Sequence, residues 1–261
     1  MIKLNIDIIK AKKEFKEYVK NYNPEDAKIK IKISHIERVS QIAKKLAEDL
    51  KLSQEDAKLA ELIGLLHDIG RFEQIKKYNT FLDKDSVNHA EYGVKILFED
   101  GLIRKFIKEE KYDKIIKLAI LNHNKIEIEE GLTEKEKIHA KIIRDADKMD
   151  IFYILTIADK EEIWNNKDLS DEKLTDEVYK EFVEDKFVNF KSMKTGVDLL
   201  AAHFSYLFNL YFKESIKIIY DKDYLKKLYN RFKFNDQQTK EKMEELYQIT
   251  QKYLEEKRKI D

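Results

Sequence analysis

Apolar residues recur along most of the chain at the three- and four-residue steps that are typical of an amphipathic α-helix. Between residues 23 and 50, one helix face carries His35, Val39, Ile42 and Leu46, while lysines occupy the opposite face. Few residues interrupt the pattern, since the 261-residue sequence has six Gly and one Pro. The pattern therefore predicts an all-α fold.

The pattern and its capping residues divide the chain into ten expected helices. Asn23 is the predicted N-cap of the second helix, and Ser53–Asp56 and Thr133–Glu136 have the spacing of capping boxes. We expect an irregular polar piece at 71–85. The expected helices cover residues 2–20, 23–50, 53–68, 86–101, 112–122, 133–158, 171–190, 196–220, 223–233 and 237–261. No repeat or flexible linker separates domains, and we predict a main helical domain at 1–160 with a helical C-terminal extension, 161–261, packed on it.

The stretch ELIGLLHDIGRFEQ holds the most unusual chemistry, because an apolar helix ends on His67 and Asp68. We expect Gly70 to stop this helix. Burying an unpaired carboxylate costs several kcal/mol (roughly), or else shifts its pKa until it is neutral. A metal ion beside His67 and Asp68 would resolve this cost.

Further metal ligands are available at helix ends and on apolar helix faces, namely His35, His89, His123 and Asp147. Asp147 lies on an apolar stripe, and Asp150, one turn later, is placed to support it. Asp145 is expected to be exposed beside lysines. A single buried histidine can equally be a hydrogen-bonded core residue, so spacing alone leaves both interpretations open.

Composition excludes several alternatives. There is no cysteine, so the chain has no disulfide, zinc-thiolate site or thiol nucleophile. The 51 basic and 51 acidic side chains balance, so bulk charge gives no reason to expect nucleic acid or an anionic membrane as a partner. The N-terminus lacks a signal-peptide pattern, and no apolar run reaches the ~20 residues of a membrane span. We therefore expect a cytoplasmic protein.

Five motifs between residues 34 and 150 resemble those of the HD-domain superfamily of metal-dependent phosphohydrolases, which is named for its His-Asp pair. They are SHIERV, LLHDIGRFEQ, NHAEYG, LNHN and RDADKMD. The resemblance implies an HD-domain helical bundle. It also implies two divalent transition metal ions (Mn, Fe, Ni, Co or Zn), the first bound by His35, His67, Asp68 and Asp147 and the second by Asp68, His89 and His123.

The resemblance further implies hydrolysis of a small, nucleotide-like phosphomonoester or phosphodiester by a metal-activated water. Asp68, as the bridging ligand, and Arg71, directly after HDIG, are the predicted catalytic residues. Arg71, Arg38 and Lys148 are the predicted phosphate-binding residues, although each could be an ordinary surface cation. Arg71-Phe72 replaces the Glu-Asp pair of alarmone hydrolases, and the Gly-Tyr-Pro signature of cyclic dinucleotide phosphodiesterases is absent.

Two alternatives remain from the sequence. Some HD-domain proteins with the same six ligands use mixed-valent iron to activate dioxygen, which makes a di-iron oxygenase the second hypothesis. The third is a non-enzymatic sensor module that keeps the metal for stability. The aromatic-rich helix 196–220 indicates core or homodimer packing, with His203 structural, although His203 or Tyr206 could instead cover the substrate.

Overall fold

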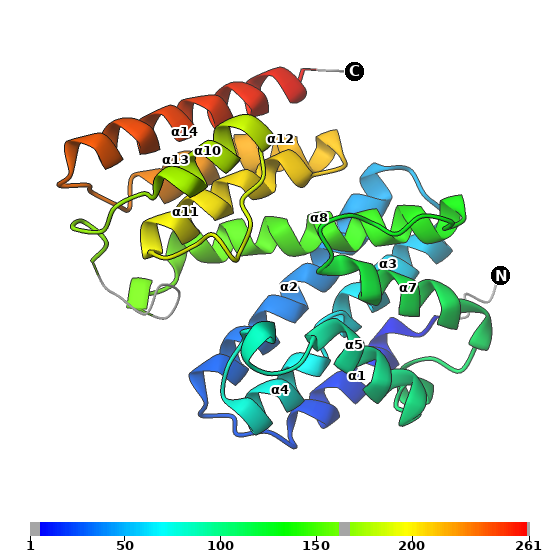
Figure 1. Ribbon diagram of the computed structural model, residues 1–261. Helices are drawn as coiled ribbons and strands as arrows, with labels where there is room; N and C mark the ends of the chain where they lie inside the picture. The colour runs from blue at the N-terminus through cyan, green and yellow to red at the C-terminus, as the bar shows by residue number, and fades with distance from the viewer. Residues whose placement is uncertain (1–5, 162–167, 260–261) are drawn as a thin grey trace. The chain divides into compact units, whose positions relative to one another are not determined.

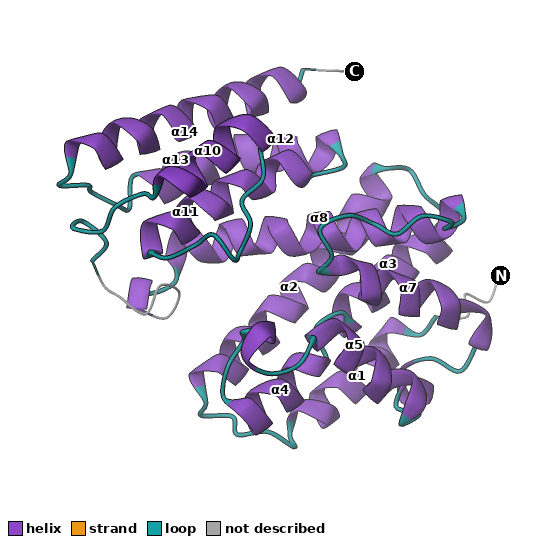
Figure 2. Cartoon of the chain, viewed as in Figure 1, coloured by secondary structure: helices purple, strands orange, loops and turns teal. Residues whose placement is uncertain are grey.

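The computed structural model describes residues 6–161 and 168–259, and every regular element in those two ranges is a helix (Figures 1 and 2). This confirms the predicted all-α fold. The chain divides into two compact units, Met1–Asp150 and Ile151–Asp261.

The first unit begins with four α-helices, α1 (Ile8–Val19), α2 (Ala27–Asp49), α3 (Gln54–Leu66) and α4 (Gly70–Tyr78). It continues with η1 (Asp83–Asp85), α5 (His89–Val94), the π-helical turn η2 (Lys95–Glu99), α6 (Ile103–Phe106), η3 (Glu110–Tyr112), α7 (Asp113–His123) and α8 (Glu134–Ile157), whose last turns belong to the second unit. The second unit also contains α10 (Asp176–Asp185), α11 (Gly196–Ser205), η4 (Tyr206–Asn209), α12 (Lys213–Asp221), α13 (Tyr224–Tyr229) and α14 (Gln237–Lys257).

Two helix starts show how local chemistry sets the elements of the first unit. The predicted capping box of α8 is confirmed, since Thr133 N–H donates to Glu136 (2.8 Å) and Glu136 N–H donates to the Thr133 hydroxyl (3.3 Å). The predicted N-cap of α2 at Asn23 is wrong. Asp26 is the N-cap and accepts from Lys28 N–H at 2.8 Å, whereas Asn23 closes a turn before it.

The prediction of an irregular segment at 71–85 is also wrong over its first half, because α4 occupies residues 70–78. Gly70 begins this helix and does not stop the previous one. A Cβ at Gly70 would lie 2.3 Å from the carbonyl oxygen of His89 and 2.6 Å from the amide nitrogen of Gly93. Glycine is therefore needed because the backbones of α4 and α5 meet at this point.

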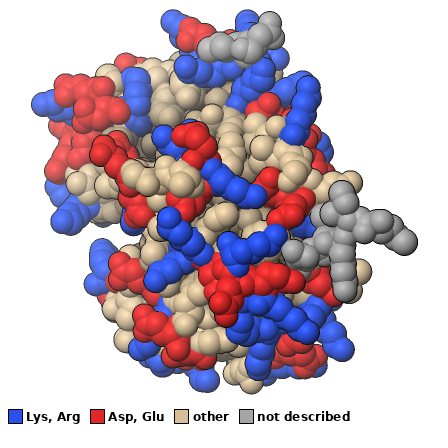
Figure 3. Space-filling model, turned by 90° about the vertical axis from the view of Figure 1, so that its right-hand side faces the viewer, with Lys and Arg blue, Asp and Glu red and all other residues tan. Residues whose placement is uncertain are grey.

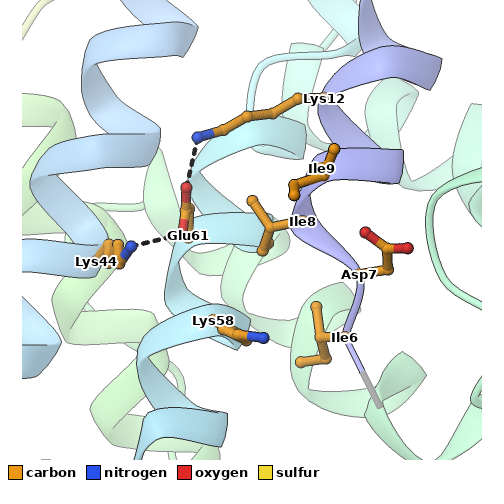
Figure 4. Close-up of a pocket in the computed structure, with 8 residues that line it drawn as sticks. All are labelled: Ile6, Asp7, Ile8, Ile9, Lys12, Lys44, Lys58 and Glu61. Carbon is orange, nitrogen blue, oxygen red and sulfur yellow. Dashed lines mark hydrogen bonds and ion pairs between the residues drawn. The ribbon is translucent and has the colours of Figure 1, made fainter. Parts of the chain in front are cut away.

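A buried carboxylate joins three helices of the first unit (Figure 4). Glu61 on α3 is 4% exposed and pairs with Lys12 on α1 at 2.5 Å and Lys44 on α2 at 3.5 Å. The two lysines compensate the charge of a carboxylate that would otherwise be expensive to bury. Beside this triad lies a pocket of about 520 Å³, into which Lys58 and Ile6 also face.

The second unit has its own core, in which α11 and α12 both pack against α14. The expected single helix over 196–220 is wrong, because the chain leaves the helix at Leu210 and begins α12 at Lys213. The break lets apolar residues on both pieces face one core, and Leu207 and Ile219 are fully buried.

On the face shown in Figure 3, groups of basic and of acidic side chains are interspersed. Within the two described ranges, no helix combines the length and the apolar character needed to cross a membrane.

Candidate metal centre

Five segments of the first unit bring the predicted ligands to one place. His67 is the C-cap of α3 and Asp68 follows it, so the end of the helix directs both side chains into the core. The other ligands come from the middle of α2, the first residue of α5, the last residue of α7, and α8. All four histidines and Asp68 are at most 5% exposed. The structure therefore gathers all six predicted residues in one cluster.

One carboxylate oxygen of Asp68 faces the first predicted metal site. Its Oδ2 lies 3.7 Å from His35 Nε2 and 3.8 Å from His67 Nε2. Asp147 completes this side, because its Oδ1 lies 3.1 Å from His35 Nε2 and 3.8 Å from His67 Nε2. These three side chains thus surround the Oδ2 side of Asp68.

The other carboxylate oxygen faces the second predicted site. Asp68 Oδ1 lies 3.4 Å from His89 Nε2 and 3.6 Å from His123 Nε2, and the two Nε2 atoms are 3.0 Å apart. Asp68 therefore stands between the two groups of ligands, with one oxygen directed to each.

Every histidine of the cluster uses its other ring nitrogen to contact an acceptor. His67 Nδ1 donates to Gly64 O at 2.8 Å, and His123 Nδ1 donates to Ile120 O at 2.7 Å. Carbonyl oxygens only accept, so the Nδ1 atoms carry the protons and the Nε2 lone pairs point into the cluster.

Carboxylates hold the remaining two rings. His35 Nδ1 lies 2.7 Å from Asp150 Oδ2, and His89 Nδ1 lies 2.6 Å from Asp83 Oδ2. Asp150 was expected to support Asp147, but the ligand that it contacts is His35. Partners of this kind orient metal-binding imidazoles and raise their basicity.

The inward-facing atoms fit a metal ion. Within the part of the chain that the structure describes, His35 Nε2, His67 Nε2 and Asp68 Oδ1 are buried without a hydrogen-bond partner, which is costly unless a cation satisfies them. Ligand atoms about 2.1 Å from a metal lie about 3.0 to 3.4 Å from one another in octahedral or tetrahedral geometry. The separations of 3.0 to 3.8 Å in the cluster approach this range, so the residues present suit divalent ions with N and O ligands.

Electrostatics favours the metal-binding form of Asp68, His67 and His89. Burial lowers the pKa of His35, but its contacts with Asp147 and Asp150 outweigh burial and raise that pKa above its usual value. Burial raises the pKa of the Asp68 carboxyl, but the Lys32 ammonium and His67 outweigh this effect and hold that pKa well below its usual value. Burial lowers the pKa of His67 and lowers the pKa of His89 to about 4. Ionised carboxylate and neutral imidazole are the forms that ligate metals.

The three cations predicted to bind phosphate lie in different surroundings. Arg38 donates from Nε and Nη2 to Asp150, at 2.6 and 3.0 Å, and so supports the carboxylate that holds His35. Burial and the neighbouring Arg144 lower the pKa of Lys148 to about 8, although the charges of Asp147 and Asp145 act in the opposite direction.

Arg71 is the predicted cation that reaches the cluster itself. Its Nη1 donates to Asp83 Oδ1 at 2.9 Å and to Phe81 O at 2.5 Å, while its Nε lies 3.6 Å from Asp68 Oδ1. The side chain is 14% exposed. Arg71 is therefore fixed next to the second predicted metal site.

Sequence reasoning missed two charged residues of the site. Lys32 lies one turn before His35 on α2, and its Nζ is 2.6 Å from Asp68 Oδ2. The i, i+3 relation to His35 was the available signal, but neighbouring lysines on the same helix obscured it. Asp83 lies in the stretch that was expected to be irregular, and no local pattern links it to His89.

The exposure expected for Asp145 is wrong, since this side chain is fully buried. Its neighbours on the helix include Ile142 and Met149, which are also buried, so α8 is enclosed on more than one face. Of the three aspartates of α8, Asp147 is the most exposed, since its side chain keeps 19% exposure, but it is the one whose carboxylate lies beside His35 Nε2 and His67 Nε2.

Arg144 on α8 fixes the segment that follows His123. The side chain is 2% exposed and donates to the carbonyl oxygens of Asn122 (2.7 Å), Lys125 (2.5 Å) and Ile126 (2.8 Å). One guanidinium thus satisfies three carbonyl groups at the end of α7. This arrangement joins the helix that bears His123 to the helix that bears Asp147.

The all-helical fold and the cluster of four histidines and two aspartates are features of a metal-binding helical protein. Residues 33–151 match the family model of the HD domain, a range that contains all six clustered residues. Residues 33–151 thus form an HD domain, a domain that is typical of metal-dependent hydrolases. A comparison with curated proteins found no match, and a comparison with solved structures found none either.

Proposed function

We propose that this protein is a phosphohydrolase that uses two divalent metal ions to cleave a small, nucleotide-like phosphate ester. The observation that supports this proposal most directly is the division of ligands around Asp68, with His35, His67 and Asp147 on the Oδ2 side and His89 and His123 on the Oδ1 side. When bound, a pair of metal ions lowers the pKa of water and stabilises charge on the phosphoryl oxygens.

The protein's own residues bind and orient the reactants. Asp68 faces the ligands of both predicted metal sites. Lys32 and Arg71 place positive charge on either side of its carboxylate, since Lys32 Nζ lies 2.6 Å from Oδ2 and Arg71 Nε lies 3.6 Å from Oδ1. These cations would bind phosphoryl oxygens and stabilise the charge that develops on them.

The reaction balances without an additional reactant. The oxygen of water forms a bond to phosphorus, and the bond between phosphorus and the ester oxygen breaks. The leaving alkoxide takes up one proton from the water. No side chain is consumed in this reaction.

Asp68→Asn tests this proposal directly. Asn keeps the size of the side chain but lacks the negative charge needed to bridge two dications, so we expect turnover to fall at least ~100-fold while the helical circular dichroism is retained. The assay is phosphate or alcohol release from metal-loaded protein, with monoesters, diesters and nucleotides as substrates. Asp100→Asn, at an exposed position, is the matched control.

The possible outcomes separate the three hypotheses. Ester hydrolysis that depends on Asp68 supports the phosphohydrolase. Dioxygen consumption without phosphate release from any ester would indicate an oxygenase, and the absence of both activities would indicate a metal-stabilised sensor module. Near-native turnover by the Asp68→Asn protein would contradict the bridging role.

A further inference from the structure

Two cations flank the central carboxylate of the cluster from opposite ends. Lys32 Nζ lies 2.6 Å from Asp68 Oδ2, on the side of His35, and Arg71 Nε lies 3.6 Å from Asp68 Oδ1, on the side of His89. Each proposed metal position therefore has one basic side chain beside it.

Phe81 lies beside both of these cations. Its ring centroid is 5.3 Å from Lys32 Nζ and 5.9 Å from the Cζ atom of Arg71, and its carbonyl oxygen accepts a hydrogen bond from Arg71. Cation–π contacts of this kind hold both side chains near one ring. The two cations are thus neighbours in one basic site and not separate surface charges.

Both cations keep donors that a ligand could use. An ammonium group has three N–H donors, and Asp68 accepts one of those of Lys32. Within the described ranges, the hydrogen bonds of Arg71 are all donated by its Nη1 group, to Gln74, Phe81 and Asp83, so its Nη2 donors remain for a ligand. The side chains of Lys32 and Arg71 are 16% and 14% exposed, so a small anion can reach them from solvent while most of the cluster stays buried.

From this arrangement we infer that Lys32 binds substrate and, together with Arg71, makes the site selective for phosphomonoesters over phosphodiesters. The inference rests on the proposed function and extends it to the substrate class. A terminal phosphate is a dianion at neutral to alkaline pH, whereas a diester carries a single negative charge. Coulomb attraction to each cation grows with the charge of the ligand, so two cations beside the metals favour the dianion.

The test is the binding of two anions to metal-loaded protein by calorimetry at alkaline pH. Inorganic phosphate stands for the monoester dianion and dimethyl phosphate for the diester monoanion. We expect Lys32→Met to weaken phosphate binding by at least about tenfold, which is the loss expected for one charge-assisted hydrogen bond, and to weaken dimethyl phosphate binding less. Lys32→Arg should retain most of the preference for phosphate.

Lys30→Met is the matched control, because Lys30 is an exposed lysine of the same helix that pairs with Glu25. The metal content of every variant is measured first. Loss of metal from the Lys32→Met protein but not from the Lys30→Met protein would overturn the inference, since Lys32 would then act on the metal ligands and not on phosphate.

The remaining outcomes separate this inference from the proposed function. If the Lys32→Met protein bound phosphate as tightly as the wild type, and the wild type still hydrolysed esters, the role of Lys32 would be wrong and the phosphohydrolase would stand. A wild type that bound neither anion and hydrolysed no ester would overturn both. A lower monoester-to-diester ratio of kcat/KM in the Lys32→Met protein would support the inference independently of calorimetry.

Discussion

Replacing Gly70 by alanine should disrupt one half of the metal centre without touching a ligand. The new Cβ would lie 2.3 Å from the carbonyl oxygen of His89, about 1.1 Å short of the 3.4 Å at which ordinary contacts begin. Both groups belong to helix backbones, so no flexible side chain can move aside. The first turn of α5 must therefore shift away from α4 by about 1 Å.

A shift of this size is large compared with the tolerance of a metal site. Distances between a metal and its ligands vary by about 0.2 Å in well-formed sites. His89 Nε2 is 3.4 Å from Asp68 Oδ1, and the ring is fixed by its contact with Asp83, so a rotation of the side chain cannot recover the position. We expect Gly70→Ala to lose the second metal ion and to lower the free energy of unfolding by about 1 to 3 kcal/mol, the usual cost of overpacking.

The assay combines elemental analysis after gel filtration with thermal unfolding. Gly131→Ala is the control, because Gly131 has a positive φ of 79° and open space around it, so alanine there is strained without a collision near the cluster. We expect the Gly131→Ala protein to lose some stability and keep both metals. A Gly70→Ala protein with wild-type metal content and stability would refute the argument from backbone contact, and equal metal loss in both variants would indicate general destabilisation.

Two further predictions concern the histidines His89 and His203. By elemental analysis, His89→Ala should reduce bound metal from about two ions per chain to about one, because Asp68, His67 and His35 still form the first site. An unchanged metal content would mean that His89 has a structural role. His203 is buried in the second unit, where desolvation lowers its pKa to about 4, below the value of about 6.5 for an unfolded chain. The unfolded state therefore binds the proton first, so folding stability should fall by up to about 3 kcal/mol as pH drops from about 6.5 to about 4. In denaturant titrations at several pH values, the free energy of unfolding of the His203→Gln protein should depend less on pH than that of the wild type. The same pH dependence in both proteins would contradict the prediction.

The features that the sequence predicted correctly depend on neighbours along one helix. Helical periodicity placed His35 on a buried face, and the Thr133–Glu136 spacing gave the capping box of α8. Each of these relations spans at most four residues, so a linear pattern contains the information.

The features that it missed depend on contacts between helices. The need for Gly70 arises from α5, the burial of Asp145 from a second enclosed face of α8, and the partner of His89 from a segment without a helical pattern. The sequence shows Lys32 one turn before His35, among other lysines of the same helix. Only the position of Asp68 in the fold identifies Lys32 as the lysine that contacts the cluster.

The metal centre also has a consequence for the order of events in folding. His35 and Asp150 are 115 residues apart in the chain, and Arg144 joins α8 to carbonyl groups 18 to 22 residues before it. Closing so long a loop costs entropy that is recovered only when α2 and α8 dock. Before that step, the first predicted metal site would offer an ion only His67 and Asp68. A bound metal ion would therefore stabilise the protein mainly by slowing its unfolding, with little effect on how fast it folds.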